Sequence, residues 1–426
     1  MHPQKSTAPG SRFALRFLKT TAATLCAATL AARALAQQVL IPSPVIPPES
    51  RAVASPVEDT NLVDSASATT EAPLVPRDSQ PFQWGPLSFH PHLAYQFLSG
   101  TGIQSQTNQA HSTLIQQISP GIELDLGRVW KFDYTPTFLL YSDSHFRDSV
   151  DHLINLAGDT SYEDWKLGLV QNCAITSDPQ VQTAQQTDQQ TYLTSLKAAW
   201  QINSDNSLEL GASQNLQYAT GFTSSRDWST LDWLNHEWGP NLAAAGGVEF
   251  GYTAVDAGAN MTHEQLQGRI TWRVAHKVNL SINGGSEFRQ FLDSTNSQLI
   301  TPVFGAAITY QPFEVTTLSL NGARNLSASY FAGQTAEATS INVNLTQRLL
   351  KRFFLGLTGG YANTLYHGAT DSRQDNYSFV SASLNTVVLK RRGTVSLFYS
   401  ASKNSSNVPG FAYSSNQVGF QLAYRY

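Results

Sequence analysis

The residues whose types could support chemistry gather in one short stretch of the chain. Asp143, His145, Asp148, Asp151 and His152 crowd what reads as a loop between two strand-like segments. A histidine beside a carboxylate can activate water for hydrolysis, and the same side chains could bind a divalent cation. Their spacing matches no specific motif, and polar loop tips often collect Asp and His. Catalysis and metal binding therefore stay open here only as alternatives to a plain polar loop.

The rest of the sequence adds no catalytic signature. It contains no Gly-x-Ser-x-Gly, no His-Glu-x-x-His and no phosphate-binding loop. Cys173 is the only cysteine beyond the N-terminal 36 residues, so an intramolecular disulfide is not expected there. We assign no catalytic, cofactor-binding or metal-ligating residue, and we predict that the protein is not an enzyme and uses no cofactor.

The last residues of the chain indicate which elements carry such loops. One face of the final segment is apolar and the other is mostly polar. The apolar face comprises Val418, Phe420, Leu422, Tyr424 and Tyr426, and the other face holds Gly419, Gln421, Ala423 and Arg425. This pattern is typical of the closing strand of a transmembrane β-barrel, with lipid outside and a wet lumen inside. The last strand of a soluble sandwich is the alternative.

Alternation of this kind runs from residue 87 to residue 426. Residues 129–140 show it clearly, with Trp130 and Phe132 on one face and Lys131 and Asp133 on the other. Tight turns alternate with longer polar loops, which we place at 99–110 and 177–189 among others. Short turns on one side and long loops on the other are typical of outer-membrane barrels. We therefore predict an all-β fold, a transmembrane antiparallel up-and-down β-barrel of about 18 strands.

The same alternation assigns charged side chains to the lumen. The candidates are Lys131, Asp133, Arg269, Arg273, Glu287, Arg289, Arg348 and Arg425. Both signs are present, which favours a hydrated interior over a strongly ion-selective ring. Arg269, Arg273 and Arg289 lie beside Glu287 on neighbouring strands. They could form a basic ladder that favours anionic or sugar solutes, or a salt-bridge network that stiffens the wall.

The N-terminal part of the chain divides into two segments that precede the barrel. Residues 1–36 read as a signal peptide, with basic residues first, a short apolar run, and Ala34 and Ala36 before the cleavage point. Residues 37–86 are rich in proline and show no period, so we predict a disordered periplasmic segment. The predicted domains are therefore 1–36, 37–86 and 87–426.

Composition limits the class of partner. Removing the five basic residues of the leader from the 27 in the chain leaves 22 basic against 31 acidic side chains, a net charge of −9. An acidic chain argues against nucleic-acid binding. Charged residues make up only 14% of the sequence, and no apolar run beyond the leader reaches the length of a membrane helix. Both features suit a barrel with a lipid-facing wall.

The signal, the proline-rich leader and the run of long hairpins over 87–426 resemble the "putative β-barrel porin" type of outer-membrane protein. The segment SPGIELDLGRVWKFDYTPTFLLYS, residues 119–142, is similar to an early hairpin of such proteins. The chain ends on Tyr426, where many barrels end in Phe. The resemblance covers most of the chain after the leader and rests on pattern more than on a unique motif.

The resemblance implies a location in the bacterial outer membrane and contact with its lipid. It also implies that the barrel assembly machinery reads the terminal strand. For function, we expect a porin that lets small hydrophilic solutes diffuse passively or with weak selectivity. A conduit for exported polysaccharide is the alternative, and a surface receptor or enzyme barrel is a third. The sequence holds no plug domain ahead of the barrel, which disfavours a gated transporter.

Overall fold

A computed structural model describes residues 82–426 except 128, 276, 293–297, 369–371 and 390–391. The predicted signal peptide and residues 37–81 of the proline-rich segment lie outside these residues. The described chain forms 19 strands in one sheet. They are β1 (Phe82–Trp84), β2 (Leu87–Gln106), β3 (Gln109–Leu126), β4 (Trp130–Tyr141), β5 (Ser149–Tyr162), β6 (Trp165–Gln180), β7 (Gln185–Gln201), β8 (Asn206–Ala219), β9 (Ser225–Gly239), β10 (Leu242–Val255), β11 (Met261–Ala275), β12 (Val278–Phe291), β13 (Gln298–Phe313), β14 (Thr316–Ala328), β15 (Thr335–Leu349), β16 (Phe353–His367), β17 (Arg373–Val388), β18 (Gly393–Ser406) and β19 (Tyr413–Arg425).

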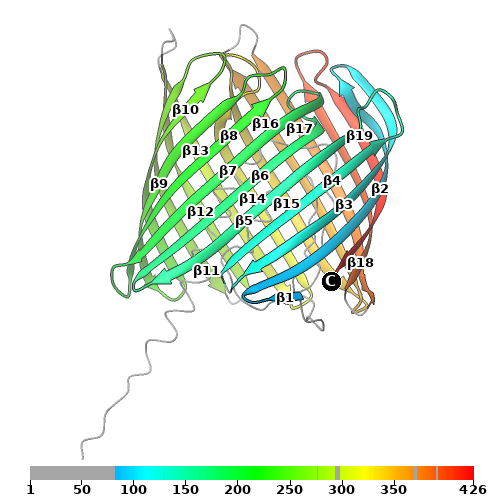
Figure 1. Cartoon of the computed structure of the whole chain (residues 1–426). Coiled ribbons are helices and arrows are strands. Elements are labelled where there is room, and N and C mark those ends of the chain that lie inside the picture. Colours follow the sequence, from blue (N-terminus) through cyan, green and yellow to red (C-terminus); the bar gives the residue numbers. More distant parts are fainter. Residues whose placement is uncertain (1–81, 128, 276, 293–297, 369–371, 390–391) are drawn as a thin grey trace, which may run out of the picture.

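The sheet closes on itself and leaves no long free edge. Each strand from β2 to β18 pairs antiparallel with the next, and β19 pairs antiparallel with β2, from Asn416 opposite Thr101 to Arg425 opposite His92. Closure satisfies the backbone groups that an open sheet would leave unpaired in lipid. Figure 1 shows the tilted strands of this wall. The predicted antiparallel barrel of about 18 strands is confirmed.

Connections at the two ends of the barrel differ in length, as predicted. At the lower end in Figure 1, where the C-terminus lies, short turns join successive strands, such as Glu163-Asp164 between β5 and β6. At the upper end the loops include residues 142–148 and 329–334. Short turns mark the periplasmic side and longer loops the extracellular side.

Two of the predicted loops are wrong. Residues 99–110 and 177–189 are mostly strand, because β2 and β3 continue to Gln106 and from Gln109, and β6 and β7 continue to Gln180 and from Gln185. Their polar composition hides the strand, since neither face of these extensions needs to be apolar once it has left the membrane.

The outer face of the wall is apolar. Large apolar side chains point away from the lumen and stay exposed, among them Leu234, Phe250, Leu266, Ile300, Leu397 and Val418. A band of this extent is unstable in water and suits a hydrocarbon environment. Near the periplasmic turns aromatic residues follow, with Trp165 and Trp200 stacked at 5.8 Å between ring centroids. Amphipathic rings at this level suit the membrane interface. No helix among the described residues is long and apolar enough to cross a membrane.

The predicted disordered segment extends too far at its C-terminal end. Phe82–Trp84 form β1, which pairs with Leu87–Phe89 of β2. The Phe82 ring stacks on Tyr426 at 4.9 Å between centroids. This contact between the start of the barrel and the end of the chain gives three residues of the proline-rich segment a defined structure, which local composition could not indicate.

Candidate functional site

One inner wall of the barrel carries a chain of paired charges. Arg269 on β11 is buried and donates a hydrogen bond to the Glu209 carboxylate on β8 over 3.1 Å. It also bonds the side-chain oxygen of Asn235, and its guanidinium lies 4.5 Å from the ring centroid of Trp233. The alternation of these strands brings all four side chains to the lumen. Arg269 is therefore neutralised and held in place from three sides.

A second pair lies one strand further along the wall. Arg289 on β12 donates from Nε to the Glu287 carboxylate over 2.7 Å, and both side chains are almost fully buried. Gln265 donates to the other Glu287 oxygen, also over 2.7 Å. Arg269 and Arg289 thus engage separate carboxylates. For Arg269 and Arg289, these two pairs favour the salt-bridge network over an uncompensated basic ladder.

A histidine continues this wall toward the extracellular end. His263 lies buried between two carboxylates, 3.6 Å from Glu249 and 3.8 Å from Asp227. The hydroxyl of Thr253 donates to the same Asp227 carboxylate over 2.7 Å. Acidic, basic and neutral polar groups therefore alternate along β9 to β12.

A cavity of about 210 Å³ lies against this wall. Its lining includes Lys197, Glu209, Glu249, Arg269, Glu287 and Arg289. The volume suits a small solute, and the lining offers hydrogen-bond donors and acceptors of both signs. This lumen cavity is the candidate functional site.

A second polar wall is built by β2, β3, β4 and β19. Arg425 forms an ion pair with Glu123 across β19, β2 and β3. His92 hydrogen-bonds the Thr135 hydroxyl at 3.0 Å, and Thr135 in turn donates to Asp133 over 2.9 Å. The predicted lumen residues Asp133 and Arg425 therefore lie on the same wall, where Arg425 is opposite His92 and Asp133 is opposite Glu123 in the register. The predicted Lys131 lies opposite Asp125 in the register of the same wall.

Two of the predicted lumen residues lie nearer the periplasmic end. Arg273 is half-buried four positions below Arg269 on β11, opposite Asn279. Arg348 is exposed at the rim, where its guanidinium donates to the Lys351 carbonyl of the β15–β16 turn over 2.8 Å. Neither residue lines the lumen cavity described above, so the eight predicted residues are spread along the wall.

The tip of the β6–β7 hairpin folds into the barrel. Val181 packs against Ala362, Tyr377 and Tyr413, which belong to β16, β17 and β19 on a distant part of the wall. The neighbouring Thr183 and Ala184 are almost fully buried. The hairpin therefore crosses the lumen near its extracellular end and narrows the path. Sequence reasoning missed this constriction because the polar residues of the tip look like those of a solvated loop.

A second segment covers the mouth from the other side. The Tyr330 hydroxyl, from the loop after β14, donates to Gln189 on β7 over 2.8 Å. Gln182 of the β6–β7 tip donates to Ser329 over 2.9 Å. These contacts join the loop after β14 to the β6–β7 hairpin.

The stretch from Asp143 to His152 does not act as one cluster. Asp151 lies on β5 and accepts a hydrogen bond from the Ser177 amide over 3.0 Å. His152 points to the other face of the same strand, where it hydrogen-bonds the Tyr134 hydroxyl at 3.0 Å. The strand begins at Ser149, so alternation separates these two side chains. Only Asp143 and His145 stay together.

The terminal strand has the facing predicted from sequence. Val418, Leu422 and Tyr424 are exposed on the outer surface, whereas Gln421 is 3% exposed on the inner one. The amide of Tyr426 donates to the Pro91 carbonyl over 3.1 Å, which ties the end of the chain to β2. The strand thereby closes the barrel.

Comparison with known proteins supports the resemblance predicted from the sequence. Residues 262–426, which span β11 to β19 apart from the first residue of β11, match the family described as "Putative beta-barrel porin 2". No curated protein sequence gave a significant match.

Among solved structures, the chain is similar to OccK2 (OpdF) of Pseudomonas aeruginosa, with 10% identity and a TM-score of 0.46 over 79% of this chain and 98% of that one. The same protein in complex with glucuronate shows 9% identity and a TM-score of 0.44, over 79% of this chain and 97% of that one. OccAB4 of Acinetobacter baumannii shows 10% identity and a TM-score of 0.44, over 79% of this chain and 98% of that one.

Proposed function

We propose that this chain, a β-barrel of the bacterial outer membrane whose residues 262–426 match a porin family, is a passive pore for small hydrophilic solutes. The observation that carries the proposal is the contrast between its two faces. The outer face is an apolar band, and the inner face holds hydrogen-bonded and ion-paired polar groups around a cavity. Such an interior lets water and polar solutes exchange hydrogen bonds along the path.

The selectivity that this lumen supports is by size more than by charge. The β6–β7 hairpin and the loop after β14 narrow the extracellular mouth. On the wall beside the cavity, Arg269 and Arg289 are each paired with a carboxylate. Paired charges present a weak net field to a passing ion. We therefore expect a narrow pore with weak ion selectivity.

The other functional classes receive less support from the geometry. A conduit for an exported polysaccharide needs an uninterrupted path for a polymer, and the inward hairpin works against it. An enzyme needs an assembled catalytic group, and the stretch predicted from sequence is divided. Asp151 and His152 lie on opposite faces of β5, and only the Asp143–His145 pair stays in contact. We therefore propose a channel without enzymatic activity.

Assembly partners belong to the same proposal. The terminal strand combines an outward apolar face with an aromatic last residue that is tied to β2. We propose that the barrel assembly machinery recognises this strand while the β19–β2 seam is still open. The lipid of the outer membrane then covers the apolar band.

Conductance of the purified barrel in a planar bilayer tests the function. We expect stepwise ion conductance, and swelling of proteoliposomes in small sugars that falls off as the solute grows. A reversal potential near zero in a salt gradient would support weak selectivity. A folded barrel without conductance would contradict the pore and favour a receptor-like role.

A further inference from the structure

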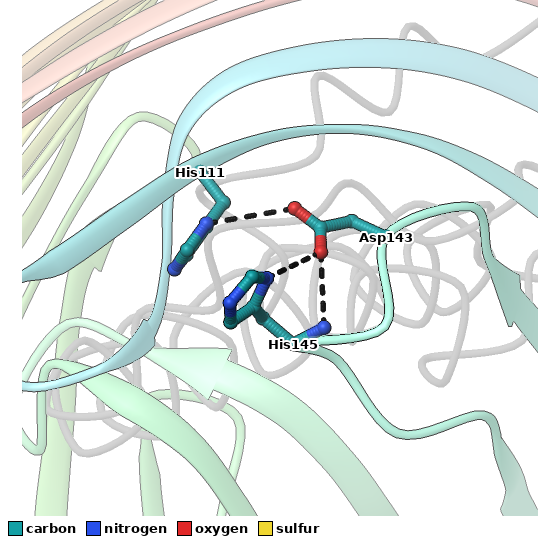
Figure 2. Close-up of side chains that lie close together, drawn as sticks. All are labelled: His111, Asp143 and His145. Carbon is teal, nitrogen blue, oxygen red and sulfur yellow. Dashed lines mark hydrogen bonds and ion pairs between the residues drawn. The ribbon is translucent and has the colours of Figure 1, made fainter.

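Two histidines and one aspartate meet at the extracellular mouth. His111 comes from the start of β3, and Asp143 and His145 come from the loop at 142–148 (Figure 2). The Asp143 carboxylate lies 2.6 Å from Nδ1 of His145 and 3.5 Å from Nδ1 of His111. One ligand atom from each residue fits within 4.8 Å of the others. Sequence reasoning missed His111 because 32 positions separate it from Asp143.

The two rings lie face to face. Their centroids are 4.0 Å apart with an angle of 20° between the planes. Both rings turn Nδ1 toward the Asp143 carboxylate, so the stacked pair presents two ring nitrogens to the same side. Nε2 of His111 is buried and has no hydrogen-bond partner. The carboxylate is the only acidic group that contacts both rings among the described residues.

Two imidazole nitrogens and one carboxylate oxygen are a common ligand set for zinc and similar transition metals. Zinc bonds of about 2.0–2.1 Å place neighbouring ligand atoms of a tetrahedron about 3.3 Å apart. The separation of 3.5 Å between Nδ1 of His111 and Oδ2 of Asp143 already fits this value. Nδ1 of His145 lies 2.6 Å from the other oxygen, Oδ1, so the Asp143 or His145 side chain has to rotate for all three residues to bind one cation. Three protein ligands leave the fourth position to water or to a ligand from outside.

We propose that His111, Asp143 and His145 bind a divalent transition-metal cation at the extracellular mouth. The site does not depend on the proposed pore function, because its ligands lie outside the lumen cavity. It would fix the loop at 142–148 to β3 at a second point. The loop is already held there by the Ser142 amide, which donates to the Leu114 carbonyl over 2.9 Å.

The position of the site gives the cation a structural effect. Directly after His145, the buried Phe146 packs with Leu98, Ile103 and Ile115 on the inner wall. Arg147 then forms an ion pair with Asp188 on β7, at the base of the inward hairpin. A cation bound to the loop would therefore hold the segment that braces this hairpin.

Calorimetric titration of zinc into the folded, full-length barrel tests the proposal. The protein should carry no polyhistidine tag and be held in a detergent without chelating groups. We expect one zinc per chain for the native protein. His111→Gln and His145→Gln should each weaken binding by at least about tenfold, since even the loss of groups that only support a ligand costs about 10–100-fold.

His152→Gln is the matched control, because His152 lies on the adjacent strand β5 but bonds Tyr134 on the other face of the wall. It should bind zinc like the native protein. Asp143→Asn gives a third test that keeps both rings. Heat-dependent migration on a gel checks that each variant is folded. Absence of zinc binding in the native protein, equal binding in the two His variants, or loss in His152→Gln would each overturn the site.

Discussion

The guanidinium of Arg269 on β11 donates to the Glu209 carboxylate on β8 over 3.1 Å, across the two strands that lie between them. A contact over this distance along the wall exists only because the sheet curves into a barrel. It places a neutral pair beside the lumen cavity, where single charges would set ion selectivity.

Replacing Arg269 by Gln should shift the pore toward cations, because the Glu209 carboxylate then loses its positively charged partner. Glu209→Gln should shift it the opposite way. The reversal potential in a gradient of potassium chloride measures both. Screening reduces the effect at 1 M salt, where charges act over about 3 Å. Removing one partner of a fully buried ion pair lowers the free energy of unfolding by about 3–5 kcal/mol. We expect a smaller loss of stability here because the lumen contains water. Shifts of the same sign would contradict the pairing.

Replacing Arg269, Arg273 and Arg289 together by Gln should give a larger shift toward cations than the single change. The carboxylates of Glu209 and Glu287 both lose their partners in this variant. The same reversal-potential measurement applies. An unchanged potential would mean that these groups only stiffen the wall.

The inward hairpin should set the size of the open pore. Tyr377→Ala removes a ring that packs against Val181 at the hairpin tip, and truncation of a buried aromatic side chain costs about 3–5 kcal/mol. We expect a larger and noisier single-channel conductance. Tyr361→Ala is the matched control, because Tyr361 is exposed on the outer face of β16. Identical conductance in the two variants would argue against the hairpin as the constriction.

Leu422→Arg should reduce the yield of assembled barrel. Leu422 is 46% exposed on the outer face of β19, where a cation at mid-membrane costs about 2–4 kcal/mol. Gln421→Arg is a weaker control than the sequence indicates, because Gln421 is 3% exposed and packed inside. Leu153→Arg is better matched, since Leu153 lies opposite Thr135 on the lumen side and is 39% exposed. Similar outer-membrane yields for both leucine variants would refute the assigned faces.

Zinc binding at the extracellular mouth should weaken in acid, because protons compete with the metal for the ring nitrogens of His111 and His145 and for the Asp143 carboxylate. The amide and ring of His145 bond the Asp143 carboxylate and hold its pKa below the ordinary value. The hydrogen bonds to the Asp143 carboxylate therefore stabilise the folded protein at any pH above the unfolded-state pKa of this group. That stabilisation is lost as the pH falls through the lower folded-state pKa. Titrations at pH 8, 6.5 and 5 measure the loss, and a constant affinity would exclude histidine ligands.

Cleavage of the leader after Ala36 stays a prediction from sequence, since these residues lie outside the described part of the chain. Ala34 and Ala36 supply the small side chains that the cleavage needs. N-terminal sequencing of the exported protein checks the site. A mature chain that still contains Arg33 would disprove it.

The sequence by itself determined the barrel. Alternation fixes which residues share a face, so Leu422 and Gln421 were assigned correctly from their order alone. The same rule put Arg269 and Glu287 in the lumen, because facing along a strand is a local property. Turn spacing, together with the even strand number of bacterial barrels, then gave about 18 strands, since each hairpin is local in the chain.

Only the tertiary structure decided which groups meet. Glu209 reaches Arg269, and Val181 reaches Tyr377, through closure of the sheet and passage of a hairpin across the lumen. His111 joins Asp143 because a loop folds back onto β3. These contacts depend on curvature and on the paths of loops between distant strands. Neither property produces a periodic pattern in the sequence. Alternation therefore predicted which residues face the lumen but not which residues they contact.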